Sequence, residues 1–463
     1  MNRIGIIGGG ASGIVAAIAA ARSDGDAQVF ILEQKENIGK KILATGNGRC
    51  NLTNEAMDAS CYHGEDPEFA RNVLKQFGYG ETLEFFASLG LFTKSRGGYI
   101  YPRSDQAASV LELLEMELRR QKVKIYTGVR VEALKLSAKG FVIRADGQRF
   151  PADRVILACG GKASKSLGSD GSGYALARSM GHTLSPVVPA LVQLKVKKHP
   201  FAKAAGVRTD AKVAALLGRQ VLAEDTGEMQ ITAYGISGIP VFQISRHIAK
   251  GLYEGKEMKV RVDFLPEMEA SQVRKAFNTH LDKCPYATCQ EFLTGIFPKK
   301  LIPRLLELSH IRQNFPASEL KPAQWEDLIR ACKQTLLTIE DTNGFDNAQV
   351  CAGGVRTGEV YPDTLESRYA DGLYLTGELL DVEGICGGYN LQWAWATGYL
   401  AGRAGLVFKL HILIAHSFLD GRYILHLYIH GIYIVKFWLP SRVQGLFFYF
   451  IRKKRIFADA KSL

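Results

Sequence analysis

The sequence predicts an α/β fold in which one domain is interrupted by an insertion. A strand, a glycine-rich turn, a helix and a second strand follow one another in residues 4–33. Residues 187–336 differ in character, first with short alternating strands and then with helices, and residues 373–404 return to a strand followed by a helix that glycines open. Because strands alternate with helices at both ends, we expect the two ends to form one domain.

The first unit is the most informative stretch. Ile4–Ile7 is an apolar strand that leads into the turn GGGASG at residues 8–13, and Ile14–Ala21 is an alanine-rich helix. A second strand, Val29–Leu32, ends at Glu33. A secretory signal does not fit, because three consecutive glycines interrupt the apolar run and strand periodicity resumes at once.

The turn has the order G-x-G-x-x-G, and each glycine has a physical role. Gly8 permits the tight turn, Gly10 lets a pyrophosphate approach the backbone, and Gly13 lets the helix pack closely on the strand. The helix N-terminus offers free N–H groups to phosphates. Glu33 is placed to accept hydrogen bonds from ribose hydroxyls. The unit therefore predicts a dinucleotide site.

Composition indicates a globular protein in a reducing compartment. Hydrophobic residues make up 47% and charged residues 22% of 463 residues, enough for about two or three domains. The eight cysteines form no C-x-x-C pair and no zinc-like spacing. We therefore expect a cytoplasmic protein with no metal site and no dithiol relay.

The net charge of +12 is concentrated at one end of the chain. Residues 405–463 hold nine Lys or Arg and two Asp or Glu, so residues 1–404 are close to balanced. The high pI of about 9.2 is therefore a weak indication of nucleic-acid binding. No aromatic-basic RNA motif is recognised in residues 1–404.

The segment after Glu33 is dense in groups that bind phosphate or a heteroaromatic ring. Residues 39–54, GKKILATGNGRCNLTN, combine glycines, amides and cations and have no hydrophobic period. We expect this loop to lie along the cofactor. Helices are expected at 66–90 and 105–121 and a hairpin at 92–101; strands are expected at 122–126, 129–136, 141–145 and 154–158.

Two further glycine-rich turns are expected to approach the dinucleotide. The strand at 154–158 leads into Cys159-Gly160-Gly161, and residues 169–173 open a helix at 174–180. The insertion then comprises a β-rich domain at 187–266 and a helical lid at 267–336, with no second G-x-G-x-x-G. We expect it to cap the cofactor and shape a substrate pocket.

The return of the first domain, residues 337–404, suits a flavin. Leu373–Thr376 is a strand that delivers Glu378 and Asp381, and Gly387-Gly388 opens a helix that runs to about Ala404. An acid can bond the ribityl or diphosphate side, and a helix N-terminus stabilises negative charge on a reduced flavin. FAD is favoured over NAD because FAD is long enough to need both ends of the chain.

These residues resemble the BaiN/YhiN family of NAD(P)/FAD-dependent oxidoreductases, also labelled aminoacetone-oxidase-family FAD-binding enzymes. The resemblance covers residues 1–404 and implies a two-part Rossmann-like FAD-binding domain, at 1–186 and 337–404. It rests on GGGASG (8–13), GKKILATGNGRCNLTN (39–54), ACGGKA (158–163), GSDGSGYALA (168–177), YGISGIPVFQIS (234–245), CAGGV (351–355) and LTGELLDVEGICGGYNLQWAWATG (375–398).

The motifs and the resemblance together assign a set of cofactor-binding residues. The glycine turn and Glu33 would hold the ADP half, residues 39–51 would run along the flavin, and residues 377–391 would meet its ring. The predicted set is Gly8, Gly10, Ala11, Ser12, Gly13, Glu33, Gln34, Lys41, Thr45, Gly46, Asn47, Arg49, Cys50, Asn51, Val131, Gly160, Gly161, Gly377, Glu378, Asp381, Gly387, Gly388, Tyr389, Asn390 and Leu391.

No catalytic residue is predicted. Some polar residues near the expected ring could tune the flavin or protonate a substrate, although each suits a flavin contact or scaffold role better. They are Lys41, Asn47, Arg49, Cys50, Cys386 and Tyr389.

Residues 405–463 depart from the family pattern. They hold four of the ten histidines and about a quarter of the aromatic residues. A membrane anchor is one interpretation, but charges and histidines break the apolar run, and the β-branched and aromatic content favours strands. An out-of-frame C-terminus is the other, since composition changes abruptly where family members would end.

The sequence predicts an FAD-dependent oxidoreductase reduced by NAD(P)H as a transient donor and acting on a small molecule. No specific nucleic-acid partner is expected, and no membrane partner unless residues 405–463 form an anchor. Two alternatives stay open: an FAD-containing RNA-modifying or RNA-binding protein, and a dehydrogenase held at a membrane by residues 405–463.

Overall fold

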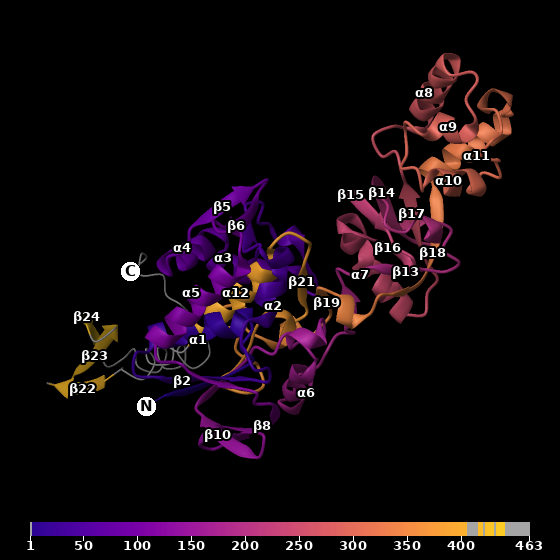
Figure 1. The fold of residues 1–463 in the computed structure, drawn as a ribbon. Helices are drawn as coiled ribbons and strands as arrows, with labels where there is room; N and C mark the ends of the chain where they lie inside the picture. Colours follow the sequence, from indigo (N-terminus) through magenta and orange to yellow (C-terminus); the bar gives the residue numbers. More distant parts are fainter. Residues whose placement is uncertain (1, 405–414, 420–421, 430–431, 440–463) are drawn as a thin grey trace. The chain divides into compact units, whose positions relative to one another are not determined.

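The computed structural model describes residues 2–404, 415–419, 422–429 and 432–439. Its contacts divide the chain into two compact units, residues 1–402 and 403–463, each described by itself (Figure 1). The first unit contains all the elements that form the site.

A five-stranded parallel sheet is the framework of the first unit. Its order is β20-β11-β1-β2-β7, and every neighbouring pair is parallel. All carboxyl ends of the strands therefore meet at one edge, where open α/β sheets bind ligands. This sheet confirms the predicted α/β, Rossmann-type fold. The strands are β1 (Arg3–Ile7), β2 (Gln28–Glu33), β7 (Lys124–Thr127), β11 (Arg154–Leu157) and β20 (Leu373–Leu375).

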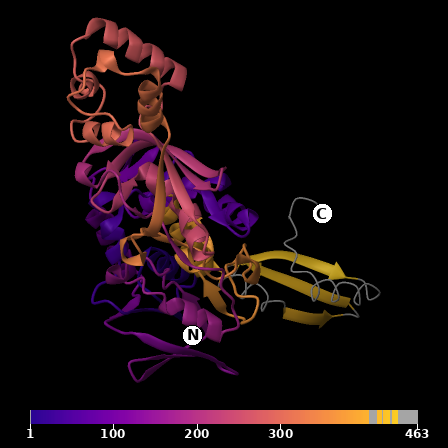
Figure 2. The ribbon, with the colours of Figure 1, turned by 90° about the vertical axis from the view of Figure 1, so that its right-hand side faces the viewer.

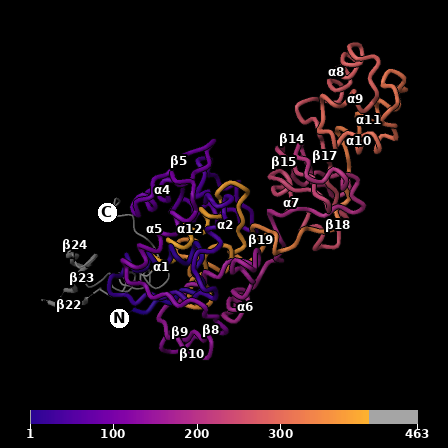
Figure 3. Tube along the Cα trace, in the orientation of Figure 1, coloured from indigo at the N-terminus to yellow at the C-terminus, as the bar shows by residue number. Residues whose placement is uncertain are grey.

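Two helices from opposite ends of the first unit, α1 (Ala11–Ser23) and α12 (Tyr389–Arg403), pack at backbone contact. A Cβ atom placed on Gly398 would lie 2.3 Å from the Ser12 carbonyl oxygen, and one on Gly402 would lie 2.4 Å from that of Ala16. Figure 3 shows the indigo and yellow-orange traces side by side there. Small residues four apart on α12, facing the alanine-rich α1, thus join the two ends of the chain.

The remaining elements of this part cover the sheet or extend from it. The expected helix at 66–90 is two helices, because the chain breaks at Phe77 and Gly78. These elements are α2 (Lys40–Ala44), β3 (Thr53–Asn54), β4 (Tyr62–Gly64), α3 (Pro67–Gln76), α4 (Tyr79–Ser88), β5 (Thr93–Arg96), β6 (Tyr99–Pro102), α5 (Ala107–Arg120), β8 (Val131–Ser137), β9 (Gly140–Ala145), β10 (Gln148–Ala152) and α6 (Ser172–Ser179).

The insertion begins with a closed six-stranded barrel whose order is β13-β16-β15-β14-β17-β18. Helix α7 (Ile239–Tyr253) packs against it through buried Val241, Ile244 and Ile248. The strands are β13 (Leu194–Val196), β14 (Arg208–Leu217), β15 (Gln220–Ile231), β16 (Gly235–Gly238), β17 (Met258–Asp263) and β18 (Thr335–Thr342).

The barrel differs from the expected domain boundaries in its last strand. The helical segment was expected to extend to 336 and the first domain to resume at 337, whereas Thr335–Thr342 is the strand that closes the barrel. It pairs with β17 and also with β13, where Leu194 lies opposite Thr342. Such non-local pairing has no local sequence pattern, so the boundary could not be seen in the sequence.

Four helices lie between β17 and β18 (Figure 2). Phe277, Phe292 and Trp325 form edge-on and tilted ring contacts at their centre, and this core is continuous with that of the barrel. The helices are α8 (Ala270–Lys283), α9 (Cys289–Leu293), α10 (Ile302–Leu308) and α11 (Pro322–Lys333).

Two short antiparallel strand pairs lie outside both the parallel sheet and the barrel. β12 (Val188–Ala190) pairs with β19 (Val350–Ala352), and β21 (Val382–Gly384) pairs with β4, each antiparallel. The β12–β19 pair joins the segment that leads into the barrel to the segment that follows it, whereas β4 and β21 both belong to the first domain.

The second unit contains a three-stranded antiparallel sheet of β22 (Ala415–Leu419), β23 (Arg422–Ile429) and β24 (Ile432–Leu439). The other residues of 405–463 lie outside the described residues. The two interpretations of this segment, a membrane anchor and an out-of-frame C-terminus, concern these residues as well. Among the helices that the structure describes, none has the length and apolar character needed to cross a membrane.

Substitution of Gly398 tests the contact between α1 and α12. Gly398→Ala should destabilise the protein by about 1–3 kcal/mol, because the new methyl group would overlap the Ser12 carbonyl and force the helices apart. Gly80→Ala in α4 is the matched control, since a Cβ there meets nothing within 4 Å; it should be neutral or stabilising by up to about 1 kcal/mol. Urea unfolding of both variants gives the comparison, and equal stabilities would contradict the close packing.

Candidate cofactor site

A cavity of about 620 Å³ lies at the carboxyl edge of the parallel sheet. Its wall is formed by segments from both ends of the first unit, chiefly residues 7–12, 32–51 and 377–394. Its size is within the range of cofactor pockets in proteins. The cavity is thus built by chain segments that are distant in sequence and meet through the sheet and the α1–α12 contact.

The glycine turn has the geometry that a bound pyrophosphate requires. Gly8 has φ 106°, and a Cβ on it would lie 2.4 Å from the Ala158 carbonyl oxygen. A Cβ on Gly13 would lie 1.9 Å from the Gly8 carbonyl oxygen, so helix and turn are in backbone contact. Gly10 lines the cavity and faces open space, with no atom within 4 Å of a Cβ placed there. That space is the cradle which a phosphate would fill.

Glu33 closes this part of the site at the end of β2. One carboxylate oxygen accepts from the Gly9 amide at 2.7 Å and the other from the Lys35 amide at 2.8 Å. The side chain is buried yet lines the cavity. Since each carboxylate oxygen accepts more than one hydrogen bond, Glu33 keeps acceptor capacity for ribose hydroxyls.

The loop at residues 39–51 follows the cavity from the glycine turn onward. The Gly39 amide donates to the Gly9 carbonyl at 2.8 Å, which ties the loop to the turn. Gly46 and Asn47 are both left-handed, with φ of 55° and 54°. This conformation turns the loop so that Thr45, Gly46 and Asn47 all line the cavity.

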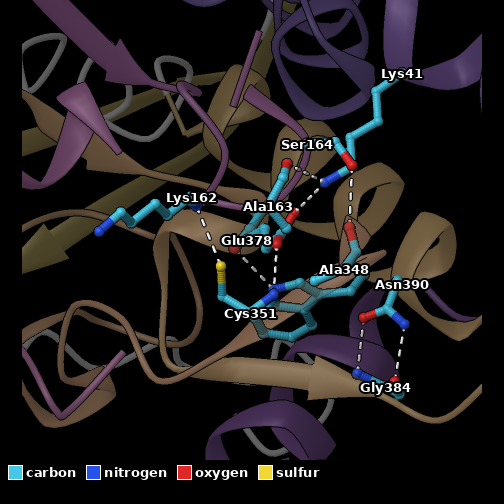
Figure 4. A network of polar contacts seen from close by, with 11 residues as sticks. Lys41, Lys162, Ala163, Ser164, Ala348, Cys351, Glu378, Gly384 and Asn390 are labelled. Carbon is cyan, nitrogen blue, oxygen red and sulfur yellow. Dashed lines mark hydrogen bonds and ion pairs between the residues drawn. The ribbon is translucent and has the colours of Figure 1, made fainter. Parts of the chain in front are cut away.

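A polar network joins this loop to the returning chain (Figure 4). Lys41 forms a 2.8 Å ion pair with Glu378, whose other oxygen accepts from the Cys351 amide at 2.7 Å. The Lys162 amide donates to the Cys351 sulfur at 3.2 Å. Burial raises the pKa of the Cys351 thiol to about 12, so the sulfur accepts as a neutral thiol. The network holds one cation and one carboxylate of the cavity wall in fixed positions.

The N-terminus of α12 faces the cavity on the opposite side. Gly387, Gly388 and Asn390 line it, and the Asn390 side chain accepts from the Gly384 amide and donates to the Gly384 carbonyl, both at 2.8 Å (Figure 4). Beside Gly388, the buried Asn51 side-chain oxygen has no hydrogen-bond partner. An unpaired acceptor and free helix N–H groups together fit the polar edge of a flavin.

Most of the predicted cofactor residues lie on this wall. The structure brings them together from the turn, the loop, β8, the turn after β11 and the start of α12. Those that line the cavity are Gly8, Gly10, Ala11, Ser12, Glu33, Gln34, Lys41, Thr45, Gly46, Asn47, Asn51, Val131, Gly160, Gly377, Glu378, Gly387, Gly388, Asn390 and Leu391.

Six predicted residues do not line it. Gly13 and Gly161 allow close packing behind the wall, because a Cβ on Gly161 would lie 2.9 Å from the Glu378 carboxylate. Cys50 is fully buried, and burial raises its pKa to about 12. Asp381 is also buried away from the cavity, with one carboxylate oxygen unpaired. The Arg49 side chain is exposed instead.

Tyr389, the sixth, is positioned by the first domain's own backbone. Its hydroxyl donates to the Ala56 carbonyl at 3.0 Å, and its ring packs edge-on against Tyr62. The residue begins α12, so its effect on the site is to orient the helix N-terminus.

The structure adds wall residues that the sequence did not indicate. Tyr99 and Tyr101 of β6 line the cavity, as do Ile239 and Phe242 of α7. The two tyrosines alternate along a strand and so point to one face, which is the pattern that could have identified them. None of residues 267–336 lines the cavity, so the insertion contributes through Leu191 and α7 rather than through its helical segment.

Two cavity-lining thiols are held in the protonated form. Burial raises the pKa of Cys159 and of Cys386 to about 12 each. Cys386 adjoins the Gly387 turn, and its amide donates to the Gln243 side chain of α7 at 3.0 Å. Both are therefore neutral thiols at neutral pH, which makes them weak nucleophiles but leaves each with its proton.

A histidine pair lies where α7 meets the β4–β21 strand pair. His63 of β4 and His247 of α7 stack edge-on with ring centroids 6.4 Å apart. Burial and the neighbouring Arg246 and Lys250 lower the pKa of both to about 4. Arg246 itself bonds the buried Glu383 carboxylate at 2.6 Å, and burial raises the pKa of Glu383.

Substitution of Gly10 tests the phosphate cradle. Gly10→Ala should leave the stability of the cofactor-free protein unchanged, since the methyl group meets no protein atom, and should weaken FAD binding by about tenfold or more. Titration of the apoprotein with FAD, followed by flavin fluorescence, measures this. Gly80→Ala is the control, and an unchanged affinity in Gly10→Ala would show that no pyrophosphate binds at the turn.

The histidine pair predicts how stability depends on pH. Their folded pKa lies below the unfolded value of about 6.5, so the stability they contribute is full above pH 6.5 and is lost as pH falls toward 4. Replacing both by glutamine should reduce the drop in melting temperature between pH 7.5 and pH 5 by about 1–3 °C. Equal drops in wild type and variant would contradict the buried neutral pair.

Several solved flavoenzymes have a similar chain trace. One is the 3-ketosteroid delta1-dehydrogenase from Sterolibacterium denitrificans, 11% identical with a TM-score of 0.47, covering 88% of this chain and 100% of that one. Another is the open conformation of a flavocytochrome c3 fumarate reductase, 14% identical with a TM-score of 0.43, covering 87% of this chain and 78% of that one.

Sequence comparisons give a family for the chain. Two proteins named ribosomal RNA dihydrouridine synthase are similar to it: that of Escherichia coli (strain K12) is 26% identical over 85% of this chain and 95% of its own length, and that of Haemophilus influenzae is 28% identical over 85% and 96%. The model of the HI0933-like protein Rossmann domain matches residues 2–404, which include every cavity-lining residue. The chain therefore belongs to the HI0933-like Rossmann family, the flavoprotein family that its motifs resemble, and is a flavin-dependent oxidoreductase.

Proposed function

We propose that this flavoenzyme reduces the 5,6 double bond of a uridine in ribosomal RNA, with NAD(P)H as the electron donor. The observation that carries the proposal is the match to two relatives named ribosomal RNA dihydrouridine synthase over 95% and 96% of their lengths. The alignment is therefore with whole proteins of that name rather than with a shared nucleotide-binding fold alone.

The proposed reaction balances as a two-electron reduction. Uridine, NAD(P)H and one proton give 5,6-dihydrouridine and NAD(P)⁺: one ring carbon gains a hydride, the adjacent carbon gains a proton, and the carbon–carbon double bond becomes single. When bound, FAD supplies the redox chemistry that accepts a hydride from one partner and delivers it to the other.

The chain's own residues have three tasks in this reaction. The Gly10 cradle and Glu33 would hold the ADP half of the cofactor. The N–H groups at the start of α12, beside Gly387, would stabilise negative charge on the reduced ring. Cys386 lines the cavity beside Gly387 and keeps its thiol proton, which it would donate to the uracil carbon.

The electron donor would use the same cavity. No second G-x-G-x-x-G occurs in the sequence, which favours a nicotinamide that binds transiently and leaves before the uridine enters. A small free molecule as the acceptor, expected from the sequence with no nucleic-acid partner, is the competing hypothesis. The names of the relatives favour RNA over it.

The test is a single-turnover reduction of RNA. The FAD-loaded protein is reduced with NADPH without oxygen and mixed with ribosomal RNA transcribed in vitro. We expect the flavin absorbance to return and digested nucleosides to show one dihydrouridine per flavin oxidised. The Cys386→Ala variant should keep its FAD and its reduction by NADPH, while its oxidation by RNA slows by about 100-fold.

Two results would contradict the proposed substrate or the proposed proton donor. If the reduced enzyme is oxidised by a small unsaturated compound but by no RNA, the proposed substrate is wrong. If RNA oxidises the reduced flavin of Cys386→Ala at the wild-type rate, another group donates the proton.

A further inference from the structure

The β5–β6 hairpin gathers cations and aromatic rings in residues 92–103, FTKSRGGYIYPR. Phe92 is 81% exposed and Tyr99 39% exposed, so neither ring contributes fully to the core. Arg96 and Arg103 are exposed as well. A hairpin that leaves two large rings in water beside cations has a surface that its own fold does not explain.

The hairpin adjoins the cavity. Tyr99 and Tyr101 line the cavity, and Tyr99 is also exposed to solvent, which places it at the opening. An atom of the Tyr99 ring lies 2.9 Å from the position of a Cβ on Gly387, at the turn before α12. The aromatic surface therefore leads from solvent to the part of the cavity that fits the flavin ring.

The cations around the hairpin outnumber the carboxylates. Lys94 and Arg96 both bind Asp105, the latter at 2.7 Å. Arg49, from the cofactor loop, is close enough to help lower the pKa of Asp105, although its own side chain is exposed. The backbone amide of Arg103 donates to the Phe92 carbonyl at 2.7 Å, which places Arg103 beside the base of the hairpin.

The carboxylates near these cations are Asp105 and Glu55, and the Glu55 amide donates to the Gly98 carbonyl at the hairpin turn. Among the described residues, four cations, namely Arg49, Lys94, Arg96 and Arg103, thus accompany two acids, which leaves a positive surplus. Asp105 holds Lys94 and Arg96 in place, and the guanidinium of Arg96 lies 5.9 Å from the centre of the Tyr101 ring. Two of the four cations, Lys94 and Arg96, are thus held in place before any ligand binds.

We propose that the β5–β6 hairpin, with Arg49, binds an unpaired segment of RNA at the opening of the cavity. This rests on the proposed function. Exposed rings stack on bases, cations neutralise phosphates, and the two together are how proteins bind single-stranded nucleic acid. A paired segment would be a poorer substrate, because a base must leave the helical stack before its ring can enter a cavity.

The test compares two triple variants of the full FAD-loaded chain. The hairpin variant is Phe92→Ala, Arg96→Gln and Arg103→Gln, none of which lines the cavity. The control is Tyr286→Ala, Arg274→Gln and Arg330→Gln, which removes one 96% exposed ring and two exposed arginines from the helical segment. Each is titrated with a fluorescein-labelled uridine-rich 12-nucleotide RNA at several salt concentrations, with anisotropy as the readout.

We expect the hairpin variant to bind the RNA about tenfold or more weakly, with a log–log salt slope smaller by about 1.4, because two phosphate contacts are lost. The control should bind within about twofold of wild type. FAD content and reduction by NADPH should be unchanged in both, which shows that the cavity is intact.

Two outcomes would overturn the proposal, and they are distinguishable. If wild type binds the RNA and the hairpin variant binds it equally well, the RNA surface lies elsewhere and the proposed function stands. If wild type neither binds the RNA nor has its reduced flavin oxidised by ribosomal RNA, the proposed function fails and the hairpin inference fails with it.

Discussion

The packing of α12 on α1 at backbone distance determines where every other part of the site lies. Gly398 and Gly402 have no side chains, so the last helix of the first unit can rest on the carbonyls of Ser12 and Ala16. The contact places the N-terminus of α12 opposite the glycine turn before α1. The cavity lies between them and is lined by segments from both ends of the first unit.

The cavity has a consistent electrostatic organisation. Two helix N-termini, those of α1 and α12, point their N–H groups into it and favour negative charge at both ends. Between them, the Lys41–Glu378 pair adds one fixed cation with its compensating acid. The buried thiols stay neutral. The wall thus suits a cofactor with anionic phosphates at one end and a ring that gains electrons at the other.

Local sequence predicted those parts of the molecule that depend on local chemistry. The glycine turn, Glu33 and the helix at 389–403 each have a pattern tied to φ angles, close approach or helix capping, and the structure has them where they were expected. Pairing between distant segments has no such pattern, so the strand Thr335–Thr342 was assigned to the wrong side of a boundary. Asp381 was chosen for its charge at a strand end, yet it turns inward, and burial of that kind depends on the packing of β21 against β4.

The two tyrosines of β6 show the same difference between local sequence patterns and contacts of distant segments. Tyr99 and Tyr101 alternate on a strand, but only three-dimensional contacts, of Tyr99 with Gly387 and of Tyr101 with Gly46, bring them to the cavity. Arg49 lies far from them in sequence and reaches the same surface through Asp105. Counting charges along the sequence therefore assigns most of the positive charge to residues 405–463. It does not reveal the local surplus of cations at the β5–β6 hairpin beside the cavity.

Hydrogen exchange of the first unit with and without FAD tests the two-part site most directly. We predict that FAD slows amide exchange in three separated segments together: the glycine turn at 8–13, the loop at 39–51 and the start of α12 at 387–391. Protection confined to residues 8–33, with the loop and α12 exchanging as in the apoprotein, would contradict it. The dinucleotide would then be held by the N-terminal half alone, and the two ends of the chain would not share one cofactor.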